Sequence, residues 1–234
     1  MRRDGQFAID SYVHVYNRGT KKLPIFRKKS DLWRLLFNFY YLNSSEPIAQ
    51  NWKRELERGE GPAAFIWPPA WGEREPLVSI LAHSIMPNHF HLILKELVEG
   101  GISKFMHRVC MAYSKFINAK YGENGALFQG PYKARLITDD TDIRYLAAYV
   151  MVKNPFELYP GGLHRAIKEF DLAYDFACRS PFNSLAEYAG VRALPIITKD
   201  ILGESFETAN DFKEFSRDCM LYKLEQLGAT AFFS

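Results

Sequence analysis

Two histidines separated by one residue are the first feature of this sequence that could do chemistry. His89 and His91 flank Phe90 in a run of strand-forming residues. Because successive side chains of a strand alternate between its faces, both imidazoles point to one side and Phe90 to the other, toward the core. Two neutral imidazoles so placed can chelate one divalent ion and leave positions for a third ligand, water and substrate oxygens. The spacing alone predicts either such a site or two half-exposed histidines.

The remaining histidines and the cysteines lack spacings of this kind. His14, His83, His107 and His164 have no partner at ligand spacing, and we predict structural roles for them. Cys110, Cys178 and Cys219 are widely separated, without the pattern of a zinc site or a disulfide framework. We expect them to be small buried apolar residues in a reducing cytoplasm.

A hairpin is the element that must position the two histidines. Strand-forming residues at 78–85 and 89–94 are separated by the turn signal Met86-Pro87-Asn88. An earlier strand over 11–16 runs into the turn signal Asn17-Arg18-Gly19, and a helix with an N-cap at Ser30-Asp31 follows it. The segment from about 44 to 76 is rich in proline and reads as an inserted loop around a charged helical patch at 52–58.

The second half of the chain supplies the remaining elements. Apolar residues at helical spacing predict a helix over 102–120 that stops at Tyr121-Gly122, then a strand over 128–137. Thr141 is the expected N-cap of a helix that ends at Pro155, and further helices are expected near 163–170, 184–189 and 210–227. The order β-α-(insert)-β-β-α-β-α predicts an α+β fold with a mainly antiparallel sheet.

Composition and charge narrow the class of protein. The 234 residues are 47% hydrophobic and 24% charged, which excludes wholesale disorder. Apolar runs such as Leu92-Ile93-Leu94 are far shorter than the roughly 20 residues of a membrane span, and no signal core follows Met1. The net charge is +6 over 1–43, −3 over 44–100, +4 over 101–153 and −4 over 154–234. The basic blocks predict either a phosphate-binding face or a generic solvated surface.

The longer run Met86-Pro87-Asn88-His89-Phe90-His91-Leu92-Ile93-Leu94 resembles a known family. It is similar to the histidine-hydrophobe-histidine (HUH) signature of the single-tyrosine transposases that mobilise insertion sequences, in particular their REP-associated tyrosine transposase branch. Other segments agree in order and spacing, namely 17–19 with 24–26, 102–106, 127–134, Tyr149 before Asn154-Pro155, and 180–188. The resemblance covers about residues 11–190.

The resemblance implies a cytoplasmic DNA nuclease and strand transferase that acts on single-stranded or hairpin DNA. It implies a ferredoxin-like HUH core within residues 1–160, interrupted by the insertion at about 44–76, and a helical extension over 161–234. It also implies covalent catalysis through a 5′-phosphotyrosine, assisted by Mg²⁺ or Mn²⁺ held by His89 and His91. Whether the chain acts as a monomer or as a homodimer stays open.

The nucleophile implied by the resemblance is Tyr149, with Tyr145 one turn earlier as the alternative. In similar proteins a Gln or Asn four residues after the tyrosine completes the metal site, but here that position is Lys153 and Asn154 is five residues on. In a regular helix five residues leave Asn154 rotated roughly 140° from Tyr149. A π-bulge would restore the alignment and make Asn154 the third ligand, with Lys153 near phosphate. Otherwise the metal is held by the histidines and water, or activity has been lost.

Several basic residues are candidates for contacts with DNA phosphates, which set affinity but carry little sequence information. They are Arg18, Lys133 and Arg135 near the predicted strands, Lys104, Arg108 and Lys115 on the predicted helix over 102–120, and Lys153. The main alternative function is a non-catalytic DNA-hairpin-binding protein descended from such a transposase. A replication initiator or relaxase type of nuclease shares the two histidines but usually carries other flanking motifs.

Overall fold

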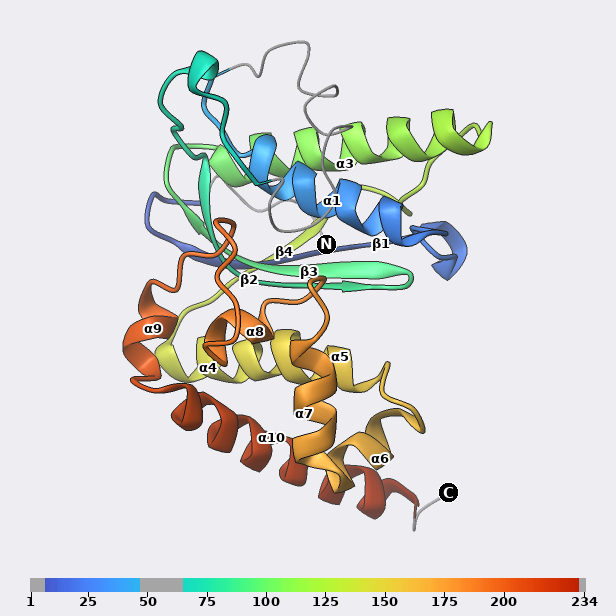
Figure 1. The fold of residues 1–234 in the computed structure, drawn as a ribbon, viewed down its shortest axis with the longest axis vertical. Coiled ribbons are helices and arrows are strands. Elements are labelled where there is room, and N and C mark those ends of the chain that lie inside the picture. Colours follow the sequence, from blue (N-terminus) through green and yellow to red (C-terminus); the bar gives the residue numbers. More distant parts are fainter. Residues whose placement is uncertain (1–6, 47–64, 232–234) are drawn as a thin grey trace. The chain divides into compact units, whose positions relative to one another are not determined.

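The computed structural model describes residues 7–46 and 65–231. The chain divides into two compact units (Figure 1). One comprises Met1–Leu81, Pro87–Ile137 and Leu194–Thr198, and the other comprises Ala82–Met86, Thr138–Ala193 and Lys199–Ser234. The predicted domain boundary at residue 160, between the HUH core and the helical extension, stays a prediction.

A four-stranded antiparallel sheet organises the first unit. Its strands are β1 (Tyr12–Arg18), β2 (Val78–Met86), β3 (His89–Glu96) and β4 (Lys133–Leu136), in the order β2-β3-β1-β4. The end of β2, from Ala82 onward, is counted with the second unit. With helices α1 (Lys29–Tyr41) and α3 (Gly101–Tyr121), the chain runs β-α-β-β-α-β, which is the ferredoxin-like order. The predicted α+β class and antiparallel sheet are confirmed.

One face of this sheet is covered by helices. α1 and α3 pack against each other, and α3 also contacts β3 (Figure 1). Strand alternation places Val15 and Phe90 on this side, and both are fully buried. The ring of Phe39 in α1 lies 5.8 Å from that of Phe90 and 6.5 Å from that of Phe105 in α3. The prediction that Phe90 points to the core is therefore confirmed.

The helices of the first unit confirm one predicted helix end and correct one predicted helix start. α3 ends at Tyr121 and is capped by Gly122, whose φ of 64° is left-handed, so the predicted stop at Tyr121-Gly122 is confirmed. α1 has Lys28 as its N-cap, so the prediction of a cap at Ser30-Asp31 is wrong. Asp31 acts instead from the third helical position, where its carboxylate accepts hydrogen bonds from the backbone N–H groups of Arg27 and Lys28.

The strand predicted over 128–137 is shorter than expected. Only Lys133–Leu136 pairs continuously, and Phe128 forms an isolated bridge with Gly19. Pro131 lies between these two pairings and has no N–H to donate to a ladder. The helical patch predicted at 52–58 lies outside the described residues. In the described part of the chain, no helix is long and apolar enough to cross a membrane.

The second unit is helical. It contains α4 (Asp140–Ala148), the π-helical turn η4 (Tyr149–Lys153), α5 (Asn154–Phe156), α6 (Gly162–Lys168), α7 (Phe170–Cys178), α8 (Leu185–Tyr188), α9 (Ile201–Ser205) and α10 (Ala209–Ala231). α10 packs on α4 and α6, and α7 packs on α5, α6 and α8 (Figure 1). The three predicted C-terminal helices are present, whereas α7 and α9 were not predicted. The cap of α4 is Asp139, whose side chain accepts from the N–H of Asp142, so the predicted cap at Thr141 is wrong.

Candidate active site

Seven side chains share the sheet face opposite α1 and α3. Residues directly across from each other on paired strands point to the same side, and the register pairs Arg18 with His89, Tyr16 with His91 and with Lys133, and His14 with Arg135. We call this set the histidine face; its members are His14, Tyr16, Arg18, His89, His91, Lys133 and Arg135. The predicted placement of both histidines on one side of the strand is confirmed.

The two histidines of the motif lie close together, and each is oriented by a neighbour. Their ring centroids are 5.0 Å apart, with an angle of 86° between the ring planes. Nδ1 of His89 lies 2.6 Å from Oδ1 of Asn88, and Nδ1 of His91 lies 2.8 Å from Nε2 of His14. Because Nδ1 of each ring is engaged in this way, Nε2 is the nitrogen that suits a metal ligand.

His14 and Tyr16 are members of this face that the sequence did not single out. The rings of His14, Tyr16 and His91 lie side by side, with centroids 5.1–5.4 Å apart and planes 13–28° apart. The alternation of His14, Val15 and Tyr16 already placed both rings on one side of a strand. Their contact with His91 required the pairing of β1 with β3, which the sequence did not specify.

The basic residues predicted to contact DNA fall into separate groups. Arg18, Lys133 and Arg135 belong to the histidine face. Lys104, Arg108 and Lys115 lie instead on α3, in the helical layer over the opposite face of the sheet. Of these six residues, the first three share the side of the sheet that carries His89 and His91, whereas Lys153 belongs to the second unit.

A groove of about 740 Å³ runs along α3. One wall is the outer side of α3, with Lys104, Arg108 and Lys115, and the other is the segment 125–132; we call it the α3 groove. Nζ of Lys104 donates to the carbonyl of Ser45 at 3.0 Å, and Nη1 of Arg108 donates to that of Ser44 at 2.5 Å. These two cations thus also hold the start of the inserted loop.

The second unit contains the predicted nucleophile. Helix α4 continues into the π-helical turn η4, and the N–H of Asn154 donates to the carbonyl of Tyr149, five residues earlier. In this geometry Asn154 follows Tyr149 by one turn, as a residue four positions on would in an α-helix. The predicted π-bulge between the two residues is confirmed.

The two candidate tyrosines differ in their surroundings. Tyr149 is 37% exposed, and Nζ of Lys153 lies 4.9 Å from its ring centroid. Lys153 also donates to Oε1 of Glu157 at 2.5 Å, so its charge is shared with that carboxylate. Tyr145 is 55% exposed, and its ring centroid lies 5.4 Å from that of Phe215.

Asn154 and Pro155 depart from the sequence-based expectation. The helix was expected to end at Pro155, but Asn154 has α-helical dihedrals (φ −63°, ψ −51°) and the helix continues to Phe156. A proline in a regular helix clashes with the carbonyl four residues earlier. The π-turn widens the helix just before Pro155, which explains how the chain stays helical through it.

The side chain of Asn154 is a buried polar group that calls for a partner. The residue is fully buried, and neither its Oδ1 nor its Nδ2 has a hydrogen-bond partner among the described residues. A buried amide left unsatisfied costs free energy of about 1–3 kcal/mol. An oxygen ligand to a divalent ion is one role that accounts for it.

The described side chains include some, but not all, of the ligands that a divalent ion needs. Among the described residues, no three His, Cys, Asp or Glu side chains gather as a metal-binding group. Metal–nitrogen bonds of about 2.1 Å allow two ligand nitrogens to be up to about 4 Å apart, which suits rings whose centroids are 5.0 Å apart. His89 and His91 are therefore two candidate ligands in the first unit, and water or substrate would supply others.

His83 is a titratable group with a structural role, as its lack of a spaced partner predicted. It is fully buried, its backbone N–H donates to Oγ of Ser184, and its carbonyl accepts from the N–H of Ser184. Burial, assisted by the positive charge of Arg192, lowers the pKa of His83 to about 3. The imidazole is therefore neutral in the folded protein at pH 7.

The cysteines are less buried than predicted. Cys110, Cys178 and Cys219 are each half-buried free thiols. Burial still raises the pKa of each thiol to about 11. All three are therefore protonated at neutral pH, and thiolate chemistry is disfavoured.

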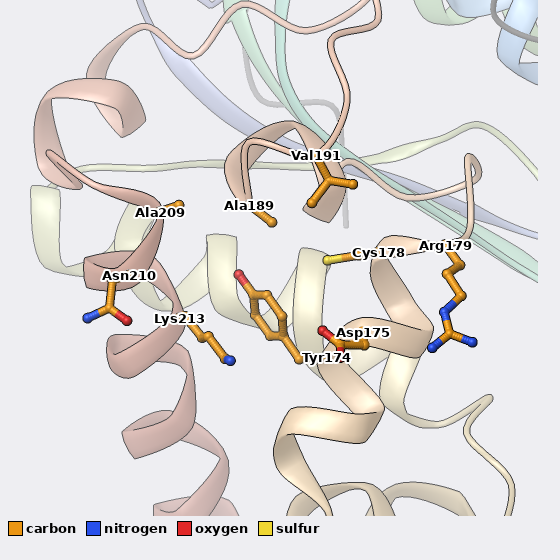
Figure 2. A pocket seen from close by; sticks show the side chains of 9 residues that line it. All are labelled: Tyr174, Asp175, Cys178, Arg179, Ala189, Val191, Ala209, Asn210 and Lys213. Carbon is orange, nitrogen blue, oxygen red and sulfur yellow. The ribbon is translucent and has the colours of Figure 1, made fainter.

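A separate hollow of about 570 Å³ lies in the second unit, between α7, the first turns of α10 and the segment after α8. Figure 2 shows Tyr174 near its middle, with Lys213 and Asn210 on the α10 side and Cys178 on the α7 side. None of the predicted site residues lines this hollow.

Comparison with known proteins agrees with the motif analysis. Residues 73–153, which include the histidine motif, Tyr149 and Lys153, match the family described as IS200-like transposases. This match confirms the predicted resemblance to insertion-sequence transposases. No curated protein matches the chain.

A solved structure described as a REP-associated tyrosine transposase bound to a REP hairpin is similar to the chain. The TM-score is 0.46 and the sequence identity is 12%, with 85% of this chain and 90% of that chain covered.

Proposed function

We propose that this protein cleaves and rejoins single-stranded DNA at hairpins as a metal-dependent single-tyrosine transposase, with Tyr149 as the nucleophile. The observation that carries the proposal is the π-helical turn from Tyr149 to Lys153. It removes the main discrepancy with the family pattern, because it makes the five-residue spacing from Tyr149 to Asn154 equivalent to one helical turn. The family match over 73–153 supports the reaction class.

The reaction exchanges one phosphodiester for another. The hydroxyl oxygen of Tyr149 attacks the scissile phosphorus and loses its proton as the bond from phosphorus to the 3′ oxygen breaks. The 3′ oxygen takes up a proton, and the 5′ phosphate stays on Tyr149 as a phosphotyrosine. Attack by a different 3′-hydroxyl reverses the step, rejoins a strand and returns a proton to Tyr149.

His89, His91 and Asn154 would hold the ion, Mg²⁺ or Mn²⁺. When bound, it would polarise the scissile phosphate and neutralise charge on its oxygens. Imidazole ligands favour Mn²⁺ over Mg²⁺ on affinity. The buried amide of Asn154, which lacks a hydrogen-bond partner among the described residues, supports its assignment as the third ligand.

Basic side chains would hold the DNA. Arg18, Lys133 and Arg135 share the sheet face of His89 and His91, which suits contacts with phosphates close to the scissile bond. Lys104, Arg108 and Lys115 would bind phosphates in the α3 groove, and Lys153 would contact a phosphate beside Tyr149 in competition with Glu157. In this proposal residues 1–160 form the catalytic domain, with the insertion at about 44–76, and 161–234 form the helical extension.

The test compares Tyr149→Phe with Tyr145→Phe as a matched pair. A labelled hairpin substrate is incubated with Mn²⁺ and run on a denaturing gel, on which a covalent adduct migrates with the protein. Tyr149→Phe removes only a hydroxyl, so we expect it to abolish the adduct and leave hairpin affinity unchanged. Tyr145→Phe should keep the adduct, because the Tyr145 ring packs on Phe215.

Two outcomes would change the proposal. An adduct that persists in Tyr149→Phe and vanishes in Tyr145→Phe would make Tyr145 the nucleophile. No adduct with the unmodified protein across many hairpins, despite tight binding, would favour the non-catalytic hairpin-binding protein.

A further inference from the structure

The turn before the histidine motif is held from outside the hairpin. Gly19 donates its N–H to the carbonyl of Asn88 at 2.8 Å, and Ile25 donates its N–H to the carbonyl of Pro87 at 2.9 Å. Side-chain Nδ2 of Asn88 donates to the carbonyl of Lys22 at 3.1 Å. The segment 19–25, between β1 and α1, therefore clamps both residues of the β2–β3 turn.

This segment has a constrained backbone. Lys21 and Lys22 both have left-handed dihedrals, with φ of 55° and 62°, which is costly for residues other than glycine. A Cβ at Gly19 would lie 2.2 Å from the carbonyl oxygen of Leu23, so a side chain there would force the segment to shift. The carbonyl of Lys22 is thus presented to Asn88 by a conformation that the surrounding bonds enforce.

The clamp determines which way the Asn88 amide faces. Its NH₂ group must face the Lys22 carbonyl, because a carbonyl can only accept. Its oxygen then faces Nδ1 of His89 at 2.6 Å, and that nitrogen must carry the proton. In a neutral imidazole the other nitrogen, Nε2, then has the lone pair that a metal ion requires.

His91 has a corresponding partner of a different type. Its Nδ1 lies 2.8 Å from Nε2 of His14, and the two ring planes are only 13° apart, so the rings meet edge to edge, as a hydrogen bond between them requires. If Nδ1 of His91 donates to His14, Nε2 of His91 is left with its lone pair, as in His89. The opposite direction of donation would place a proton on Nε2 of His91 and prevent ligation there.

We propose that Asn88 and His14 are positioning residues that hold His89 and His91 as Nδ1–H tautomers, with both Nε2 atoms prepared to bind one divalent ion. The inference rests on the proposed function, since it assigns a purpose to a metal site. It gives His14 a role beyond packing, and it explains why the segment 19–25 is bonded to the Pro87-Asn88 turn. Removing a residue that hydrogen-bonds to a metal ligand typically lowers metal affinity about 10–100-fold.

The first experiment reads the tautomers directly. Long-range ¹H–¹⁵N NMR spectra of the full-length, metal-free protein with labelled histidine distinguish the two neutral forms of each ring. We expect His89 and His91 both to be Nδ1–H tautomers. An Nε2–H tautomer at either residue overturns the proposal for that residue.

The second experiment measures Mn²⁺ binding by calorimetry in paired variants. Asn88→Ala and His14→Phe should each weaken Mn²⁺ binding 10–100-fold, although His14→Phe keeps an aromatic ring beside His91. Asn88→Asp and His14→Gln restore an acceptor and should bind within a few fold of the unmodified protein. His164→Ala, at an exposed histidine of the second unit, is the control and should not change Mn²⁺ affinity.

The outcomes separate this inference from the proposed function. Nδ1–H tautomers in a protein that does not bind Mn²⁺ would uphold the positioning role and contradict the metal-dependent mechanism. Normal Mn²⁺ binding by Asn88→Ala and His14→Phe would contradict the positioning role and leave the mechanism intact. Weak binding that the acceptor variants do not rescue would also overturn the positioning role.

Discussion

The histidine face and the α3 groove carry comparable sets of basic side chains in different surroundings. On the histidine face, Arg18, Lys133 and Arg135 accompany side-by-side rings, and His14 and His91 are only 8% and 6% exposed. In the α3 groove, Lys104 and Lys115 are exposed, and the described lining residues include a single histidine, His107. A buried, oriented ring suits chemistry, whereas an exposed amine suits contact with a phosphate backbone. The same kind of charge therefore has different expected roles on the two surfaces.

The largest expected effect comes from removing the imidazoles of the histidine face. The double substitution His89→Ala/His91→Ala should abolish Mn²⁺ binding and covalent cleavage, while hairpin affinity changes by no more than about threefold, since phosphate contacts supply most of that affinity. Calorimetry with Mn²⁺ and a gel-shift assay measure the two properties separately. Equal Mn²⁺ binding by the variant and the unmodified protein would contradict the assignment of the ligands.

An intermediate effect is expected from the α3 groove. Lys104→Ala/Arg108→Ala/Lys115→Ala should weaken hairpin binding about 10–100-fold near 0.15 M salt and lower the slope of log affinity against log salt by about 2–3. Mn²⁺ binding should be unchanged. Because Lys104 and Arg108 also hold the carbonyls of Ser45 and Ser44, the single variant Lys115→Ala is the cleaner test and should lower the slope by about 1.

The matched variant on the other surface is Lys133→Ala/Arg135→Ala. It should reduce cleavage more than affinity, because phosphates near the scissile bond are positioned there in the proposed function. If both sets of substitutions reduced affinity and cleavage in the same proportion, the distinction between the two surfaces would be lost. Affinity that did not change between low and moderate salt would remove the evidence for phosphate contacts altogether.

The smallest expected effect is on the stability of the fold and comes from His83, which belongs to neither surface. It bears on any comparison of the two surfaces that is made at low pH. The pKa of His83 is about 3 in the folded protein against 6.5 for an ordinary histidine. The unfolded chain therefore binds a proton between these values, and the folded one does not. The contribution of His83 to stability is complete above pH 6.5 and falls by up to about 1.4 kcal/mol for each pH unit below it, until about pH 3.

Urea denaturation at pH 7 and pH 5 measures this dependence. His83→Asn should unfold more readily at pH 7 and show a flatter loss of stability on acidification, whereas His164→Ala should behave as the unmodified protein does. The same pH dependence in His83→Asn and the unmodified protein would assign the acid sensitivity to other groups. If activity were lost at pH 5 while the protein stayed folded, the loss would come from groups on the histidine face or in the α3 groove.

Much of this architecture was predictable because it rests on local patterns. Strand alternation alone placed His89 and His91 on one side and Phe90 on the other, and helical periodicity with Gly122 located α3 and its end. The five-residue spacing from Tyr149 to Asn154, set against the four-residue spacing of similar proteins, pointed to a π-turn as one of three alternatives. Errors arose where a side chain acts from an unexpected position, as Asp31 does at the start of α1.

The sequence by itself determined the α+β class, from the order of its elements, and the placement of the histidine pair, from strand alternation, while its resemblance to a known family pointed to Tyr149 and to a π-turn. The tertiary structure alone decided that His14 meets His91, that Asn88 is clamped by the carbonyl of Lys22, and that the basic residues separate onto two surfaces. These contacts join residues 66 or more positions apart. They depend on strand register and on the path of the segment 19–25, which no local pattern encodes.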